Sequence, residues 1–375
     1  MSFSGGGKII FDMDGVITSE ERYWDAAALT VWELFFGGRY LRLKPLPGLP
    51  DFKVGPCAAE IASVRRIIFC EDMVIRFFKE NAVNSNWDLA FLTFSYQFLL
   101  YNKYSEEDAG AAWKPSFEAI LEAPPGFFKS FSANNAVPIA GLATDKNLSI
   151  SSLPWPGTEA GSCMAPPVWD DVRDIFQEWY YGEELFKKRY AKEPGTSGKT
   201  SLLEREAPLI PVSGIRAALQ ELLRQGWRLG IATGRPQNEI DPLLHGMDIR
   251  KYFQNDSIVT YNEVVRAENS LKDISPSLSL GKPHPYSFLK AYWGEEKGDR
   301  ELVSGVSPTP PRGMCLVVGD SMADLLAARQ AGASFIGVLT GIAGETNRKL
   351  FQEEKATAVL PDMTHIPSFL IRNHF

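Results

Sequence analysis

Short apolar runs that end in Gly, Asp or Thr recur along the chain and predict buried β-strands. The first is KIIF at residues 8–11, and comparable runs follow in WRLGIATG (227–234), DSIVTY (256–261), MCLVVGDS (314–321) and SFIGVLTG (334–341). Strands of a parallel sheet are covered by helices on both faces, so their sequences are apolar throughout instead of alternating. These runs therefore predict a parallel sheet.

Two segments with helical periodicity lie between the predicted strands. Residues 211–226 place apolar side chains at helical spacing and end in Gly226, the apolar positions being Ile215, Ala218, Leu219, Leu222 and Leu223. Residues 320–332 turn Leu325 and Leu326 inward and end in Gly332. Strands alternating with helices predict an α/β fold with a Rossmann-like, doubly wound parallel sheet.

A long aromatic-rich segment separates the first predicted strand from the others. Residues 20–210 contain about two thirds of the aromatic residues and include helical stretches at 63–81, 87–102 and 168–191. This density predicts a packed second core. We expect an α/β core formed by residues 1–19 together with 211–375, and an inserted, mainly α-helical domain formed by residues 20–210.

Segments rich in Gly, Pro, Ser and Thr predict loops around residues 141–167, 193–201 and 305–313. One of them, EPGTSGKTSLL at 193–203, ends like a phosphate-binding P-loop. Glu193 takes the place of its first glycine, and the preceding KKRYAK is charged where an apolar strand is needed. We interpret this segment as a flexible loop and not as a nucleotide site.

Composition and charge narrow the choice of partners. The formal net charge is −7 and long basic runs are missing, which disfavours nucleic acid. No apolar run approaches the roughly 20 residues that span a bilayer. The amino-terminal residues lack a secretory signal pattern and the four cysteines show no CxxC spacing, so we expect a cytoplasmic protein without a zinc site. The oligomeric state stays open.

Polar residues follow several of the predicted strands. Asp12 and Asp14 follow the first strand, Thr233 ends the second, and Asp320 ends the MCLVVGDS strand. Lys282, in GKPHP, lies in the connection after DSIVTY. Because open parallel sheets bind ligands beyond the carboxyl ends of their strands, we expect these side chains to converge on one crevice.

Four of these segments resemble the motifs of the haloacid dehalogenase-like (HAD) hydrolases, most of which are phosphatases. FDMDGVIT resembles the DxD motif, IATG the strand that ends in Thr or Ser, GKP the lysine motif, and VVGDSMAD the GDxxxD motif. Each motif alone is more often a turn or a helix cap than a catalyst, but the ordered set is specific. The resemblance covers the α/β portions, about half of the chain, and implies a HAD-like phosphoric monoester hydrolase.

The carboxylates of Asp12, Asp320 and Asp324 would lie close together in such a site. Two carboxylates about 4 Å apart repel by roughly 4 kcal/mol at an effective dielectric constant of about 20. A cluster of this kind needs cations, and oxygen ligands that leave room for water and phosphate suit Mg²⁺. We therefore predict Mg²⁺ as the cofactor, with Lys282 as the second positive charge.

The resemblance implies the two catalytic roles for Asp12 and Asp14. Asp12 is the expected nucleophile, which attacks phosphorus and forms an aspartyl-phosphate that water later cleaves. Asp14 is expected to protonate the leaving oxygen and then to act as the base for water. Both would also bind the metal, Asp12 through its carboxylate and Asp14 through its backbone carbonyl.

The remaining expected site residues hold phosphate and metal. By the same resemblance, Thr233 and the amide of Gly234 would hold the phosphoryl oxygens, and Lys282 would stabilise their charge. Asp320 would be a direct metal ligand, and Asp324 would act through water or through another ligand.

Residues 20–210 correspond to the position of a helical cap, which in this family closes over the site and selects the substrate. The segment is longer than the compact four-helix cap common there, and we expect hinges near residues 18–22 and 208–213. Arg235, in TGRP, is a candidate phosphate contact, although a surface salt bridge is the interpretation we favour.

The leading hypothesis is a Mg²⁺-dependent phosphatase that hydrolyses a small organic phosphate monoester. A phosphomutase would share the aspartyl-phosphate step and return the phosphoryl group to its substrate. A catalytically inactive phosphate-ligand-binding protein is the alternative from another class. A dehalogenase is disfavoured, because metal-free members do not need an aspartate at the position of Asp14.

Overall fold

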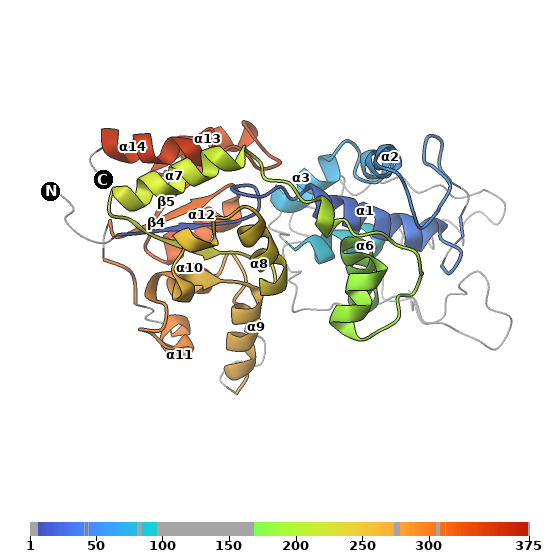
Figure 1. Cartoon of the computed structure of the whole chain (residues 1–375), viewed down its shortest axis with the longest axis horizontal. Coiled ribbons are helices and arrows are strands. Elements are labelled where there is room, and N and C mark those ends of the chain that lie inside the picture. The colour runs from blue at the N-terminus through green and yellow to red at the C-terminus, as the bar shows by residue number, and fades with distance from the viewer. Residues whose placement is uncertain are drawn as a thin grey trace. The chain divides into compact units, whose positions relative to one another are not determined.

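The computed structural model describes residues 7–95 and 169–373, apart from residues 41, 44, 81–84, 274–277, 305–307 and 312. The chain divides into two compact units (Figure 1). One combines Met1–Glu20 with Ala207–Phe375 and is called the sheet unit. The other, Glu21–Glu206, is called the inserted unit.

The sheet unit is built on six parallel strands. They are β1 (Lys8–Phe11), β2 (Arg228–Ala232), β3 (Ile258–Val259), β4 (Cys315–Gly319), β5 (Ser334–Val338) and β6 (Ala358–Leu360). Their order across the sheet is β3-β2-β1-β4-β5-β6. The first strand is therefore central, and its Phe11 pairs with Ile231 on one side and Val318 on the other.

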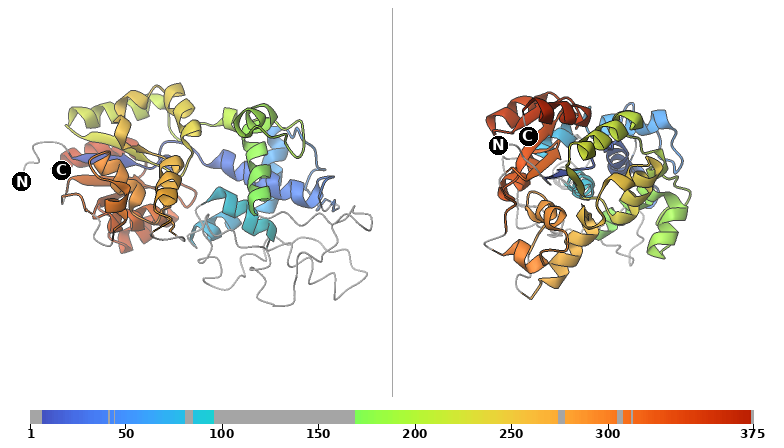
Figure 2. Two further views of the ribbon diagram at one scale, coloured as in Figure 1. Left: turned by 90° about the horizontal axis from the view of Figure 1, so that it is seen from below. Right: turned by 60° about the vertical axis from the view of Figure 1, so that its left-hand side comes forward.

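Helices cover both faces of this sheet (Figure 2), which confirms the doubly wound α/β fold. One face packs against α7 (Val212–Arg224), α8 (Gln237–Gly246) and α14 (Ile366–Arg372). The other packs against α9 (Tyr261–Ser270), α10 (Tyr286–Trp293), α11 (Asp299–Val303), α12 (Met322–Gln330) and α13 (Thr346–Glu353). The successive residues Ile9 and Ile10 of β1 are both fully buried, because they point into the cores on opposite faces of the sheet.

Two details of the sheet differ from the sequence-based expectation. The predicted strand 256–261 shrinks to the two residues of β3, because a 3-10 helix occupies Asn255–Ser257 and Thr260 caps α9. The Thr260 side chain accepts from the Asn262 amide, and Glu263 completes a capping box. In addition, the edge strand β6 was not predicted from its short, half-buried sequence AVL.

In the inserted unit, every labelled element among the described residues is helical. These elements are α1 (Glu21–Phe36), α2 (Ala58–Ile68), α3 (Met73–Glu80), α6 (Trp169–Tyr190) and a 3-10 helix at Leu203–Arg205. Residues 86–95 are also helical. Aromatic side chains form the core of this unit: Tyr23 stacks on Tyr180 with centroids 4.5 Å apart, and Trp32 and Trp179 are buried.

The helical stretch predicted over residues 63–81 is interrupted by a turn. Helix α2 ends at Ile68, and Cys70, Glu71 and Asp72 adopt positive φ before α3 begins. The guanidinium of Arg65 binds both carboxylate oxygens of Asp72, at 3.0 and 2.7 Å, and so fixes the turn.

Within the described residues the other helical predictions stand, with one interruption. The 168–191 stretch forms α6, but Gly182 has φ 71° and ψ 168° and kinks it. A Cβ at Gly182 would lie 2.5 Å from the Ser201 amide nitrogen, so the close approach of that segment requires glycine. The 87–102 stretch is helical as far as residue 95, and its remainder lies outside the described residues, as does the predicted loop 141–167.

The P-loop-like segment is not the flexible loop expected from its sequence. Lys199 has a fully buried side chain, and its Nζ lies 2.7 Å from Glu33 Oε2 and 2.5 Å from Glu178 Oε2. Glu178 Oε1 also accepts from the Gly195 amide at 2.6 Å, and Glu33 Oε1 from the Thr196 hydroxyl at 2.5 Å. The segment is therefore pinned within the inserted unit by a buried ionic cluster.

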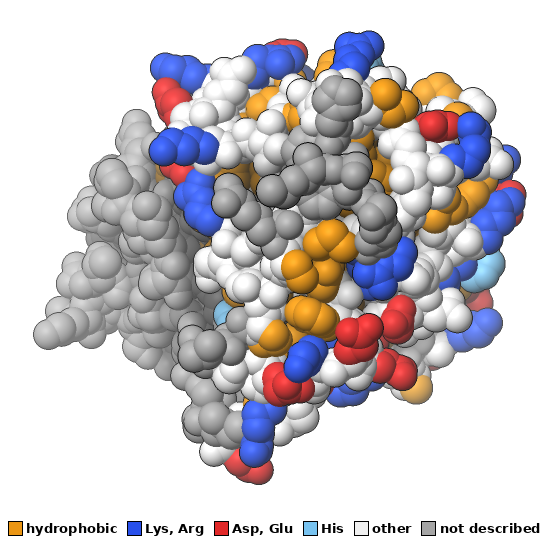
Figure 3. Space-filling view, turned by 90° about the vertical axis from the view of Figure 1, so that its left-hand side faces the viewer, with side chains coloured by type: hydrophobic (Ala, Val, Ile, Leu, Met, Phe, Trp, Pro, Cys, Tyr) orange, Lys and Arg blue, Asp and Glu red, His pale blue; other side chains and the backbone are white. Residues whose placement is uncertain are grey.

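Two surface properties complete the description. None of the helices in the described part of the chain is both long and apolar enough to cross a bilayer. On the face shown in Figure 3, acidic and basic side chains are interspersed, so no field of one sign dominates that face.

Candidate active site

The loop after β1 carries Asp12 and Asp14 beyond the carboxyl end of the central strand. The Asp12 amide donates to the Val318 carbonyl of β4 at 2.9 Å, which extends the ladder by one residue. Gly15 then adopts φ +73°, and its amide donates to the Thr18 carbonyl at 2.9 Å. Glycine meets this backbone requirement at little cost, so the chain turns away directly after the two aspartates.

Asp320 and Asp324 come from the junction of β4 and α12. Ser321 caps the helix: its hydroxyl accepts from the Asp324 amide at 3.2 Å and donates to Asp324 Oδ2 at 2.6 Å. Asp324 is fully buried, and a Cβ at Gly319 would lie 2.5 Å from the Asp324 Cβ. The sequence GDSMAD thus gives a strand end, a cap and an inward-facing carboxylate in six residues.

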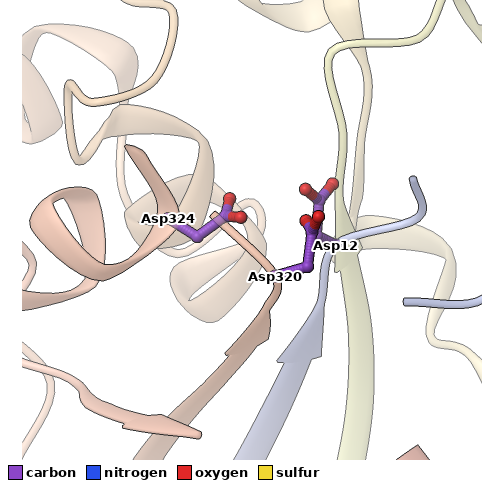
Figure 4. A group of neighbouring side chains, drawn as sticks. All are labelled: Asp12, Asp320 and Asp324. Carbon is purple, nitrogen blue, oxygen red and sulfur yellow. The ribbon is translucent and has the colours of Figure 1, made fainter. Parts of the chain in front are cut away.

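These segments bring three carboxylates together. Asp12, Asp320 and Asp324 each offer one oxygen, and the three oxygens lie within 4.8 Å of one another. Figure 4 shows the carboxyl groups of Asp12 and Asp320 side by side and that of Asp324 directed towards them from α12.

Lys282 supplies a cation inside this cluster. Its Nζ lies 2.9 Å from Asp12 Oδ1 and 2.8 Å from Asp324 Oδ1, and its side chain is 8% exposed. The ammonium also lies 5.0 Å from the centroid of the Phe288 ring. One ammonium against three carboxylates leaves an excess of negative charge, which a divalent cation with oxygen ligands would balance. The donor set therefore fits Mg²⁺.

Two glycines make room for Asp320, and sequence reasoning missed one of them. A Cβ at Gly15 would lie 2.2 Å from Asp320 Oδ2, and a Cβ at Gly341 would lie 1.8 Å from the same atom. The Thr340 hydroxyl donates to the Gly15 carbonyl at 2.5 Å, and the Asn347 amide group donates to the Asp320 carbonyl at 2.9 Å. The sequence signal that could have pointed to Gly341 is LTG at residues 339–341, because this predicted strand also ends in a polar residue.

Thr233 and Gly234 follow β2, the strand beside β1. Thr233 is buried, its amide donates to the Val259 carbonyl at 2.9 Å, and its hydroxyl accepts from the Arg235 amide at 3.1 Å. Gly234 is exposed at the tip of this turn. The structure thus places both residues at the same edge of the sheet as Asp12 and Asp14.

Arg235 is not the surface salt bridge that we favoured from the sequence. Its side chain is 1% exposed and its guanidinium lies against Asp14, with Nη2 2.5 Å from Asp14 Oδ1. The partners are 221 residues apart in the chain, so no local pattern could reveal the pair.

Comparison with known proteins finds a family model that matches part of the chain. The family described as haloacid dehalogenase-like hydrolase matches residues 165–332, a span that contains IATG, GKP and GDSMAD. The match covers a little less than half of the chain. The chain is also similar over 98% of its length to all of a crystal structure from a structural genomics programme, with a TM-score of 0.70 and 28% sequence identity.

Two curated relatives that match part of the chain are named phosphoglycolate phosphatase. Over 194 residues the chain is 30% identical to the phosphoglycolate phosphatase of Escherichia coli strain K12, and the match covers 49% of this chain and 57% of that protein. It is 27% identical over 150 residues to the phosphoglycolate phosphatase of Pseudomonas fluorescens, covering 40% and 43%. The matched part thus spans about half the length of these relatives.

Burial and neighbouring charges together shift the pKa values of Asp12 and Lys282 when no metal is bound. Burial raises the pKa of the Asp12 carboxyl to about 8, Lys282 opposes this, and Asp324 and Asp14 add to it. Burial alone would lower the pKa of Lys282, but the carboxylates of Asp12 and Asp324 outweigh it and raise that pKa. Lys282 therefore stays charged, and Asp12 takes up a proton more readily than a free aspartate.

Proposed function

We propose that this HAD-like hydrolase is a Mg²⁺-dependent phosphatase that cleaves a small organic phosphate monoester through an aspartyl-phosphate on Asp12. The observation that carries the proposal is the cluster of Asp12, Asp320 and Asp324, with Lys282 bound to two of the three. The relatives named phosphoglycolate phosphatase support the reaction class. For the substrate we propose only a small phosphate monoester.

The cation site follows from the donor set. Asp12, Asp320 and the backbone carbonyl of Asp14 would hold Mg²⁺, with Asp324 acting through water or through another ligand. When bound, the ion would supply positive charge that lets a phosphate dianion approach an acidic site. Lys282, Thr233 and the Gly234 amide would hold the phosphoryl oxygens.

The reaction proceeds in two steps on the side chains of this chain. In the first, an Asp12 carboxylate oxygen forms a bond to phosphorus while the bond from phosphorus to the ester oxygen breaks, and that oxygen takes the proton of the Asp14 carboxyl. In the second, water attacks the phosphorus of the aspartyl-phosphate, Asp14 takes a proton from that water, and the Asp12 carboxylate and inorganic phosphate are released.

We further propose that residues 20–210 act as the cap that selects the substrate and that the core consists of residues 1–19 and 211–375. The chain passes between the two compact units at Glu20–Glu21 and at Glu206–Ala207, next to the expected hinges at 18–22 and 208–213. A lid of this kind would exclude water from the first step and admit it to the second.

The test is phosphate release from a panel of small phosphate monoesters, phosphoglycolate included, with Mg²⁺ and with excess EDTA. We expect turnover that requires the metal and that disappears in Asp12→Asn. No metal-dependent turnover on any substrate would support the inactive binding protein instead. Formation of an isomeric sugar phosphate without phosphate release, followed by ³¹P NMR, would support the phosphomutase.

A further inference from the structure

Asp14 is held by an arginine that the motifs do not assign. Arg235 approaches Asp14 Oδ1 with two nitrogens, Nε at 2.7 Å and Nη2 at 2.5 Å. Nη2 also donates to the Ser19 carbonyl at 3.2 Å, and the Thr18 hydroxyl donates to Asp14 Oδ1 at 3.1 Å. Three nitrogen or hydroxyl donors therefore converge on a single carboxylate oxygen.

The arginine is itself fixed by its backbone. Its amide donates to the Thr233 hydroxyl at 3.1 Å, and its carbonyl accepts from the Tyr261 amide at 2.9 Å. These bonds tie the residue both to the expected phosphate-binding turn and to the start of α9. A guanidinium is planar and rigid, so a fork held in this way fixes the direction of the carboxyl group that it binds.

On the basis of the proposed phosphatase function, we propose that Arg235 is the residue that positions Asp14 for proton transfer. All of these donors engage Oδ1, so the oxygen that carries and delivers the proton is Oδ2. In the first step the Oδ2 proton passes to the leaving oxygen as the Asp12–phosphorus bond forms and the ester bond breaks. Arg235 touches none of the reacting atoms in this scheme and acts through the carboxyl group that it orients.

This role predicts a dependence on the leaving group that a purely structural role would not give. An alkoxide leaving group needs a proton as the ester bond breaks, whereas p-nitrophenolate is stable as an anion. Displacement of an acid by about 1 Å costs about 100-fold in rate. Loss of Arg235 is therefore expected to lower kcat/KM for an alkyl phosphate about 100-fold and to affect p-nitrophenyl phosphate much less.

The experiment compares kcat/KM for both substrates in the wild type, Arg235→Met, Arg235→Lys and Asp14→Asn. For each substrate, kcat/KM reports only the steps up to formation of the aspartyl-phosphate, so it is independent of the hydrolysis of that intermediate. We expect Arg235→Met to show the leaving-group selectivity of Asp14→Asn, Arg235→Lys to regain part of the loss, and the Asp14→Asn, Arg235→Met double variant to lose no more than Asp14→Asn.

Arg216→Met is the matched control, because Arg216 is a partly buried arginine of the same unit whose Nε binds the Met247 carbonyl at 2.8 Å. Arg216→Met should leave the ratio of the two kcat/KM values, alkyl phosphate against p-nitrophenyl phosphate, unchanged. If Arg235→Met does not fold, as judged by circular dichroism, the two substrates are compared in Arg235→Lys, which keeps one donor.

Three outcomes overturn the inference. Equal losses on both substrates would mean that Arg235 is only structural. A weaker inhibition by inorganic phosphate, with the leaving-group dependence unchanged, would make it a phosphate contact. Wild-type protein without turnover on either substrate would overturn the proposed function itself and this role with it.

Discussion

Lys282 is the residue on which the charge of the candidate site depends. Its ammonium contacts Asp12 and Asp324 at 2.9 and 2.8 Å, and all three side chains are largely withdrawn from water. A buried carboxylate that loses its partner is destabilising, because its desolvation is no longer compensated. In the proposed reaction the same ammonium would stabilise the phosphoryl oxygens, so one side chain would serve both stability and the proposed catalysis.

Replacing Lys282 by methionine should therefore weaken both properties. We expect kcat for phosphate release to fall about 100- to 1,000-fold, the usual cost of removing one charge-stabilising donor. In the absence of Mg²⁺ the free energy of unfolding at neutral pH should fall by roughly 3 kcal/mol, because the buried carboxylate of Asp324 loses its counter-ion and Asp12 loses the ammonium that it contacts. Urea denaturation and steady-state kinetics measure the two effects.

Lys290→Met is the control for this experiment. Lys290 lies in the same unit and pairs with Asp299 at 3.3 Å, with both side chains partly exposed. It should change neither kcat nor stability appreciably. A Lys282→Met variant as active as the wild type would contradict the role given to this lysine.

The raised pKa of Asp12 predicts how Mg²⁺ binding depends on pH. Below about pH 8 the Asp12 carboxyl is partly protonated, so the metal has to displace a proton. The affinity for Mg²⁺ should rise with pH, by at most about tenfold per unit, and level off above about pH 8. Isothermal titration at pH 6, 7, 8 and 9 gives this curve, and Asp12→Asn should flatten it.

The same shift acts on folding in the absence of metal. The pKa of Asp12 is higher in the folded protein than its ordinary value of 3.8, so the proton favours the folded state. This contribution is complete below pH 3.8 and is lost as the pH rises through about 8. For the Mg²⁺ titration described above, an affinity that is constant between pH 6 and 9 would show that Asp12 does not carry the proton that the metal has to displace.

At the scale of elements, the site depends on the loops that leave the carboxyl ends of the strands. The loops after β1 and β5 approach Asp320 so closely that Gly15 and Gly341 have no room for a side chain. Gly15 was part of a recognisable motif, whereas Gly341 lies in LTGIAG, a generic turn sequence. Its importance would arise from its close approach to Asp320, which follows the neighbouring strand β4.

Gly341→Ala should displace the carboxylate of Asp320 and leave the fold intact. The added Cβ would lie 1.8 Å from Asp320 Oδ2, so the carboxyl group has to move. We expect the affinity for Mg²⁺ to fall at least tenfold, in the range typical for loss of a metal-supporting contact. Gly246→Ala is the control, because a Cβ at Gly246 meets nothing within 4 Å. Equal Mg²⁺ affinities for the two variants would refute the role of Gly341.

The sequence predicted β1, β2, β4 and β5 closely, but it did not predict the break between two helices of the inserted unit. Buried parallel strands are apolar throughout, so their positions are readable without knowledge of their neighbours. The break between α2 and α3 was not, because the apolar pattern continues through it and no Gly or Pro marks it. It depends on Arg65 and Asp72, and on three residues with positive φ that sequence preference disfavours.

At the scale of the whole molecule, the candidate site follows from the order of the strands. The sheet order puts β1 between β2 and β4, so motifs about 200 and 300 residues from Asp12 end at the same edge. That convergence could be expected from the sequence, and the assigned roles stay predictions. The Arg235–Asp14 pair could not be expected, because an arginine beside a threonine turn gives no sign of its burial.

The inserted unit has an ionic core of its own, and it leads to a prediction that separates the two units. Lys199 is enclosed by Glu33 and Glu178, with its ammonium 4.9 Å from the centroid of the Trp179 ring. Burial raises the pKa of Glu178 even though Lys199 opposes the shift. Removing the ammonium would leave two buried carboxylates facing each other.

Lys199→Met should therefore loosen the inserted unit and spare the sheet unit. Hydrogen exchange measured by mass spectrometry should be faster in peptides from α1 and α6. The free energy of local opening there should fall by roughly 3–5 kcal/mol, the cost of breaking a buried ion pair. Peptides from β1 and β4, and the affinity for Mg²⁺, should be unchanged. Lys192→Met, which removes an exposed pair with Asp174, should leave all peptides as in the wild type. Unaltered exchange in α1 and α6 would mean that the P-loop-like segment is held by its backbone contacts alone. Loss of Mg²⁺ binding would mean that the ionic cluster also supports the sheet unit.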